Sequence, residues 1–219
     1  MIRITGVTKY YPVGHGRAIR RILHNINLTI NRGERWGILG RNGSGKSTLI
    51  RLLSGAEFPQ AGTIAREGTV SWPLAFGETF QGSLTGRDNT RLLARVYAVD
   101  YKKALERVEN FAELGSYLDE PVKNYSTGMR ARLAFALSMA IEFDCYLIDE
   151  ALSVGDHRFH DKCAQELFVR RADRTLLIVA HQADLIAKYC THAAVLNDGH
   201  LQQHPSVEAA LDAYYNLCN

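Results

Sequence analysis

Cysteine is scarce in this sequence and follows no recognisable pattern. The cysteines form no C-x-x-C pair and lie near no histidine cluster at zinc spacing; they are Cys145, Cys163, Cys190 and Cys218. This arrangement argues against a disulfide framework and a structural zinc site, and it favours reduced thiols in a cytosolic protein. Long apolar runs are missing too, because no stretch approaches the ~18 residues of a membrane-spanning helix. The first residues also lack the apolar core of a signal peptide, so we expect any membrane role to be that of a peripheral subunit.

A strong excess of charge is absent as well. The net charge is +3, below the strongly basic balance that by itself would suggest nucleic acid. The densest basic run holds Arg17, Arg20 and Arg21. It is typical of a solvated strand or loop edge, and contact with an anionic membrane face is the alternative. Because no repeat, low-complexity segment or flexible linker interrupts the chain, we expect one domain over residues 1–219.

The sequence does contain strands that alternate with helices. Within residues 22–30, apolar alternation places Ile26 and Leu28 on one face of a strand and Leu23 on the other. Later strands and helices alternate in both halves, which predicts an α/β fold with a mostly parallel central sheet and an antiparallel N-terminal β part. Residues 84–143 have helical periodicity throughout, and we expect them to form a helical subdomain inserted in the domain.

The segment GRNGSGKS fits the phosphate-loop pattern G-x-x-x-x-G-K-[ST]. It lies between a predicted buried strand and a predicted helix, which is the context that the mechanism requires and which makes a chance match the weaker alternative. The nucleotide-binding residues expected here are Gly40, Arg41, Asn42, Gly43, Ser44, Gly45, Lys46, Ser47 and Thr48. The backbone N–H groups and the helix N-terminus would hold phosphate oxygens, Lys46 would reach the β- and γ-phosphates, and Ser47 would bind Mg²⁺.

Two adjacent carboxylates end a later apolar strand. Asp149 and Glu150 follow the run CYLI, which places them at the carboxyl end of a strand, where α/β sheets bind ligands. Asp149 would hold Mg²⁺, and Glu150 would act as general base on the attacking water. A solvated pair of surface acids is the alternative.

Between these motifs, the tripeptide Ser126-Thr127-Gly128 precedes a long predicted helix. Taken by itself, this tripeptide is typical of a helix N-cap and nothing more. In this order and spacing, however, the chain resembles the ATP-binding cassette (ABC) ATPases. Their signature Leu-Ser-Gly-Gly-Gln occupies the place of Tyr125-Ser126-Thr127-Gly128-Met129, where the serine and second glycine match and the first glycine and glutamine do not.

The resemblance covers the whole chain and implies further roles. It implies that Tyr11 stacks on adenine, that Asp156 couples two ATP sites, and that His181 contacts the γ-phosphate. It also implies a phosphate-loop NTPase fold, ATP and Mg²⁺ as ligands, and a head-to-tail dimer. In that dimer each ATP lies between one copy's phosphate loop and the other copy's signature residues, which are Ser126, Thr127, Gly128 and Met129.

One family element is displaced. Most ABC ATPases have a Mg²⁺-sensing glutamine about eight residues before a Leu-Thr pair, but here Phe76 stands at that distance from Leu84-Thr85. Gln81, three residues before the pair, either takes this role in a shortened loop or no glutamine does. We expect Trp72, Phe76 and Phe80 to lie beside the groove that receives the membrane subunit, with plain core packing as the alternative.

The sequences of residues 71–89 and of the run CYLIDEALSVGD are similar to those of the ATPase subunits of Gram-negative capsular polysaccharide exporters. This resemblance implies a peripheral protein at the cytoplasmic face of the inner membrane, with a polytopic permease, periplasmic and outer-membrane capsule export proteins, and no nucleic acid as partner. Related O-antigen and teichoic-acid exporters are the alternative; the end of the chain just after its last helix favours the capsule branch. A soluble ABC ATPase acting on ribosomes or DNA is a weaker alternative, as is an importer.

Overall fold

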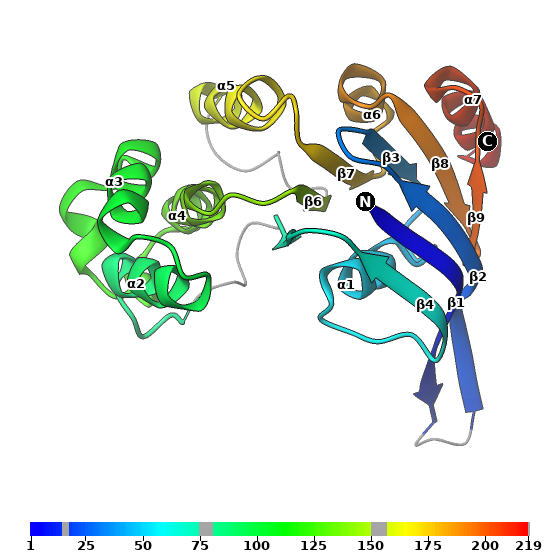
Figure 1. Cartoon of the computed structure of the whole chain (residues 1–219), viewed down its shortest axis with the longest axis horizontal. Coiled ribbons are helices and arrows are strands. Elements are labelled where there is room, and N and C mark those ends of the chain that lie inside the picture. Colours follow the sequence, from blue (N-terminus) through cyan, green and yellow to red (C-terminus); the bar gives the residue numbers. More distant parts are fainter. Residues whose placement is uncertain (15–17, 75–80, 150–156, 219) are drawn as a thin grey trace. The chain divides into compact units, whose positions relative to one another are not determined.

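The computed structural model describes residues 1–14, 18–74, 81–149 and 157–218 (Figure 1). The chain divides into two compact units. The first consists of Met1–Pro73, Phe143–Glu150 and Asp173–Asn219, and the second of Leu74–Glu142 and Ala151–Ala172.

Two β-sheets form the framework of the first unit. An antiparallel sheet has the strand order β2-β1-β4, with bounds Ala18–Ile30, Ile2–Val13 and Ala61–Arg66. The other sheet has the order β5-β6-β7-β3-β8-β9, with bounds Val70–Pro73, Cys145–Asp149, Thr175–Ala180, Arg35–Leu39, His192–Asn197 and His200–Gln203. In this spatial order, each pair of neighbouring strands as far as β8 is parallel, whereas β9 pairs antiparallel with β8. The predicted fold class is therefore confirmed.

The predicted alternation along β2 is wrong at one point. Leu23 is buried together with Ile26 and Leu28, although simple alternation would place it on the opposite face. Asn25 between them has a left-handed φ of 50°, and β2 has one extra residue between the partners of Val7 and Lys9 in β1. This bulge turns Leu23 back to the buried face, a local irregularity that strict period-two reasoning cannot show.

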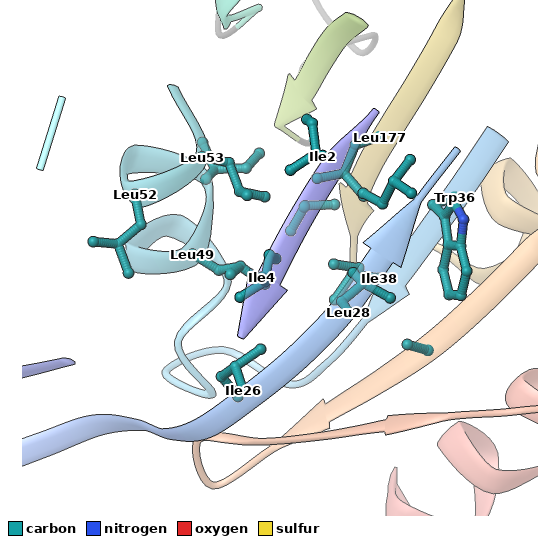
Figure 2. Close-up of a cluster of buried hydrophobic side chains, with 14 of the residues drawn as sticks. Ile2, Ile4, Ile26, Leu28, Trp36, Ile38, Leu49, Leu52, Leu53 and Leu177 are labelled. Atoms are coloured by element: carbon teal, nitrogen blue, oxygen red, sulfur yellow. The ribbon is translucent and has the colours of Figure 1, made fainter. Parts of the chain in front are cut away.

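The main core packs helix α1 (Lys46–Ser54) against strands of both sheets (Figure 2). Leu49 and Leu53 of the helix lie with Ile4 of β1 and Ile38 of β3 in one buried cluster. Full burial of such side chains contributes about 1.5–3 kcal/mol each. This packing anchors α1 to both sheets.

Two further helices belong to this unit, α6 (Ala183–Tyr189) and α7 (Val207–Cys218). A Cβ on Gly37 of β3 would lie 2.4 Å from Ile186 of α6, whereas the neighbouring Ile38 points into the core cluster. Because successive strand residues point to opposite faces, α6 covers the face of the sheet away from α1. Helix α7 packs beside α6.

The second unit is helical. It contains α2 (Gly86–Val96), α3 (Tyr101–Ala112), α4 (Thr127–Ala140) and α5 (His157–Ala164), which continues as a π-helical segment, Gln165–Val169. Short 3₁₀ segments, Gly115–Asp119 and Val122–Asn124, lead into α4. Their core includes Val108, Leu118, Leu133 and Leu137. Helices α2, α3 and α4 lie where the apolar periodicity predicts them.

Three of the cysteines have thiols that are hard to ionise. Burial raises the pKa of Cys145, Cys163 and Cys190 to about 12. Within the described parts of the chain, no helix is long and apolar enough to cross a membrane.

Candidate nucleotide site

The predicted phosphate loop connects β3 to α1 in the structure. Its backbone turns tightly, because the Ser44 N–H donates to the Arg41 carbonyl over 3.2 Å, and Gly43 and Gly45 have left-handed φ values of 84° and 110°. Gly45 is also the N-cap residue of α1. The strand–loop–helix context that a phosphate loop requires is therefore present.

Close packing leaves little room for a side chain at Gly40, the first residue of the loop. A Cβ on Gly40 would lie 2.5 Å from the Leu196 carbonyl and 2.6 Å from the Ser44 hydroxyl. That hydroxyl is buried and has no hydrogen-bond partner among the described residues. A buried polar atom of this kind needs a partner, and a glycine-rich loop with such an atom fits a bound phosphate or water.

Lys46 stabilises the loop from within. Its side-chain Nζ donates to the carbonyls of Gly40 and Arg41 over 2.7 and 3.1 Å, and the residue is only 6% exposed. Ser47 follows at the exposed start of α1. A cation held at the loop and a hydroxyl beside it supply the two chemical functions expected of a phosphate site.

The carboxyl end of β6 lies at the same edge of the sheet as this loop. Asp149 is in register with Val179 of β7, and Leu39, the last residue of β3, is in register with Ala180 of β7. His181 follows Ala180 directly and is exposed. The backbone therefore brings Asp149, His181 and the phosphate loop to one sheet edge.

Tyr11 lies near the end of β1, opposite Arg20 of β2. Its phenolic hydroxyl donates to the Glu57 carboxylate over 2.5 Å. Arg51 of α1 donates to the same hydroxyl over 3.3 Å, which connects Tyr11 to the helix that begins at the phosphate loop. Sequence reasoning missed Glu57 and Arg51, because nothing in their type or spacing indicates a partner on the first strand.

In the second unit, Ser126 is the N-cap of α4. Its Oγ accepts a hydrogen bond from the Met129 N–H over 3.2 Å, so the N-cap interpretation holds for the structure as described. Thr127 opens the helix and Gly128 follows it, with nothing within 4 Å of an added Cβ. The helix N-terminus therefore offers a small and open surface that suits an anion.

Gln81 is exposed, and its backbone is held by the buried Asn89 side chain of α2. The Asn89 amide accepts from the Gln81 N–H over 3.2 Å and donates to its carbonyl over 3.3 Å. Trp72 is half-buried, with its ring edge-on to Phe143 at 5.3 Å. Four other predicted residues lie outside the described residues; they are Phe76, Phe80, Glu150 and Asp156.

The family model described as "ABC transporter" matches residues 23–153, which include the phosphate loop, the signature segment and the carboxylate strand. The chain belongs to the ABC transporter family. This bears out the resemblance seen in the motifs and the predicted ATPase type.

Curated relatives are similar over nearly the whole length. The chain is 53% identical to the capsule polysaccharide export ATP-binding protein CtrD of Neisseria meningitidis serogroup B, over 99% of this chain and all of that protein. It is 52% identical to the ATP-binding protein BexA of Haemophilus influenzae, with 99% and 98% covered. It is 42% identical to the polysialic acid transport ATP-binding protein KpsT of Escherichia coli, with 98% and 96% covered.

Solved structures share the fold. An ATP-binding subunit of an ABC transporter has a TM-score of 0.81 at 20% identity, over 99% of this chain and 98% of that one. A dimeric ATP-binding cassette bound to ADP and Pi has a TM-score of 0.76 at 23% identity, with 93% and 98% covered. The chain therefore has the fold of an ATP-binding cassette.

Proposed function

We propose that this protein is the ATP-hydrolysing subunit of an ABC exporter that moves capsular polysaccharide across the inner membrane. The observation that carries the proposal is the 53% identity, end to end, with a capsule polysaccharide export protein. The phosphate loop supports the ATPase part independently, because Lys46 is buried in it and the buried Ser44 hydroxyl has no hydrogen-bond partner among the residues that the structure describes. Residues 1–219 would form one ATP-binding domain, since the family match includes parts of both compact units.

The proposed nucleotide contacts follow from the loop geometry. Backbone N–H groups of residues 40–48 would hold the phosphates, Lys46 would place its charge on the β- and γ-phosphates, and Tyr11 would stack on the base. Ser47 and Asp149 would hold Mg²⁺, with Gln81 as the candidate third ligand. The ion would neutralise charge on the phosphates when bound.

Catalysis would depend on groups at the carboxyl edge of the sheet. Glu150 would accept a proton from the attacking water, and a positioned base of this kind contributes about 10²–10⁴-fold. His181 would donate a hydrogen bond to the γ-phosphate oxygens. The register of β6, β7 and β3 supports both roles, because it brings Asp149, the residue before Glu150, to the edge that holds His181 and the phosphate loop.

A second copy would complete each site. Ser126, Thr127, Gly128 and Met129 of one copy would contact the nucleotide held by the other copy's phosphate loop, and Asp156 would couple the two sites. The exposed N-terminus of α4 supports this proposal, because its orphan N–H groups attract an anion. ATP binding would then close the dimer, and hydrolysis with phosphate release would open it.

The membrane partner would be a polytopic permease at the cytoplasmic face of the inner membrane. Periplasmic and outer-membrane capsule export proteins would complete the pathway, and no nucleic acid is expected. Affinity purification of the tagged chain from detergent-solubilised membranes tests this. A polytopic membrane protein recovered in stoichiometric amount supports the proposal, whereas recovery of ribosomes or DNA without such a protein would contradict it.

A further inference from the structure

A carboxylate lies at the centre of a polar cluster beside Tyr11. Glu57, in the loop after α1, accepts from the Tyr11 hydroxyl over 2.5 Å and from Arg51 Nε over 2.6 Å. Lys9 Nζ lies 3.0 Å from the same carboxylate and donates to the Phe58 carbonyl over 2.9 Å. One acidic side chain is therefore held by a phenol, a guanidinium and an ammonium group from two elements.

The cluster is partly shielded from solvent, although the side chain of Arg51 is 43% exposed. The side chain of Lys9 is 8% exposed and that of Glu57 24% exposed. Burial alone would raise the pKa of Glu57, but hydrogen bonds from Tyr11, Arg51 and Lys9 lower it to about 2. The carboxylate is therefore charged at every physiological pH and keeps its hold on the phenol.

These contacts fix what the Tyr11 ring can offer a ligand. Its hydroxyl donates to Glu57 and accepts from Arg51, so both functions of that group are engaged. Lys9 Nζ lies 5.0 Å from the ring centroid, over one face. Recognition by Tyr11 would then come from the opposite ring face, by stacking, which tolerates any base because each has a π-face.

Arg51 connects this cluster to the phosphate loop. It belongs to α1, and its terminal nitrogen donates both to the Tyr11 hydroxyl and to Thr48 Oγ1, each over 3.3 Å. Thr48 directly follows Ser47 at the start of that helix. The ring of Tyr11 and the phosphate loop are thus held together by side chains rather than by strand pairing alone.

We infer that Glu57 is a positioning residue for nucleotide binding, which holds the Tyr11 ring in the orientation that stacks on the base. The inference rests on the proposed nucleotide site. It adds a group that does not touch the nucleotide but acts through Tyr11. Because base stacking is worth roughly 5- to 150-fold in affinity, loosening the ring would cost part of that factor.

The experiment measures affinity for two probes with the full chain and Mg²⁺, namely a non-hydrolysable ATP analogue and inorganic tripolyphosphate, which has no base. Glu57→Gln should weaken binding of the analogue by about 3- to 10-fold and leave tripolyphosphate unchanged. Tyr11→Phe should have the same selective effect, and the double variant should lose no more than the larger single loss, because both changes break one interaction. Glu67→Gln, the same chemical change at an exposed turn, should alter neither affinity.

Unchanged affinity for the analogue in Glu57→Gln, or an equal loss for tripolyphosphate, would overturn the inference. If Glu57→Gln fails to fold, Tyr11→Phe decides, since it keeps the contacts of Glu57 with Arg51 and Lys9. A wild-type chain that binds neither probe would contradict the proposed function itself. Equal affinity of the wild-type chain for both probes would show that Tyr11 does not stack on the base, and it would overturn the inference. The proposed role of the phosphate loop would not be contradicted by that result.

Discussion

Lys46→Ala should have two separable effects, one on the protein without nucleotide and one on nucleotide binding. The side chain donates to two loop carbonyls, at 2.7 and 3.1 Å. Gly40 is buried, whereas Arg41 is exposed and its carbonyl can regain a water partner. Of these two carbonyls, that of Gly40 should account for the larger loss of stability, at about 1–3 kcal/mol for an unsatisfied buried acceptor.

That cost converts into a measurable melting shift. For a chain of this size, each kcal/mol corresponds to about 2–4 °C, so the variant should melt roughly 2–12 °C below wild type without nucleotide. A ligand at a free concentration of about 100 times its Kd stabilises a protein by ~2.7 kcal/mol. Mg²⁺–ATP at that concentration should therefore raise the wild-type melting temperature by roughly 5–10 °C. In the variant this second shift should disappear, because no fixed charge meets the β- and γ-phosphates.

Thermal unfolding with and without Mg²⁺–ATP measures both effects, and Lys102→Ala on the exposed side of α3 is the matched control. The control should melt and respond as wild type does. An ATP-dependent shift of wild-type size in Lys46→Ala would refute the phosphate role. An unchanged melting temperature without nucleotide would refute the stabilising role of the contact with Gly40.

Gly40→Ala should destabilise the protein by about 1–3 kcal/mol in urea unfolding, since its Cβ would lie 2.5 Å from the Leu196 carbonyl. Gly43→Ala, with a left-handed φ of 84° but open space around it, should cost only about 1–2 kcal/mol. Ser126→Ala should destabilise the protein by about 1 kcal/mol through loss of the N-cap on α4. Ser126→Thr should retain most of the stabilisation that the cap provides. The pKa of Glu57 is lowered to about 2, so its contribution to stability is present above its unfolded value near 4.5 and is lost as pH falls toward 2. The difference in unfolding free energy between wild type and Glu57→Gln should accordingly shrink below pH 4.5; a constant difference would contradict the assigned contacts.

Sequence patterns predict best those elements in which the apolar periodicity and the flanking turn or cap residues agree. The buried strand before the phosphate loop (Arg35–Leu39), the loop itself and the helix after it (Lys46–Ser54) all follow from local signals. Strands β4 and β5 follow one another along the chain, but they belong to different sheets. Sheet membership depends on long-range pairing, which local alternation does not specify.

The residues of the site also fall into two groups, those that contiguous motifs indicate and those that only the folded chain brings together. The phosphate loop, Asp149 and Ser126 are recognisable because each motif is contiguous and each has a stated chemical reason. The Glu57 cluster is not, because Tyr11 and Glu57 meet only when β1 packs beside the loop that follows α1. The burial of Leu23 likewise depends on a bulge at Asn25, which the folded register reveals.

The most direct test of the central claim replaces Glu150 by glutamine in the chromosomal copy and measures polysaccharide on the cell surface and inside the cell. The purified variant should keep ATP affinity and lose about 10²–10⁴-fold in turnover, as expected for a missing general base. The cells should then lose surface polysaccharide and accumulate it in the cytoplasm. Normal surface polysaccharide in cells whose variant protein no longer hydrolyses ATP would contradict the claim that this protein powers polysaccharide export.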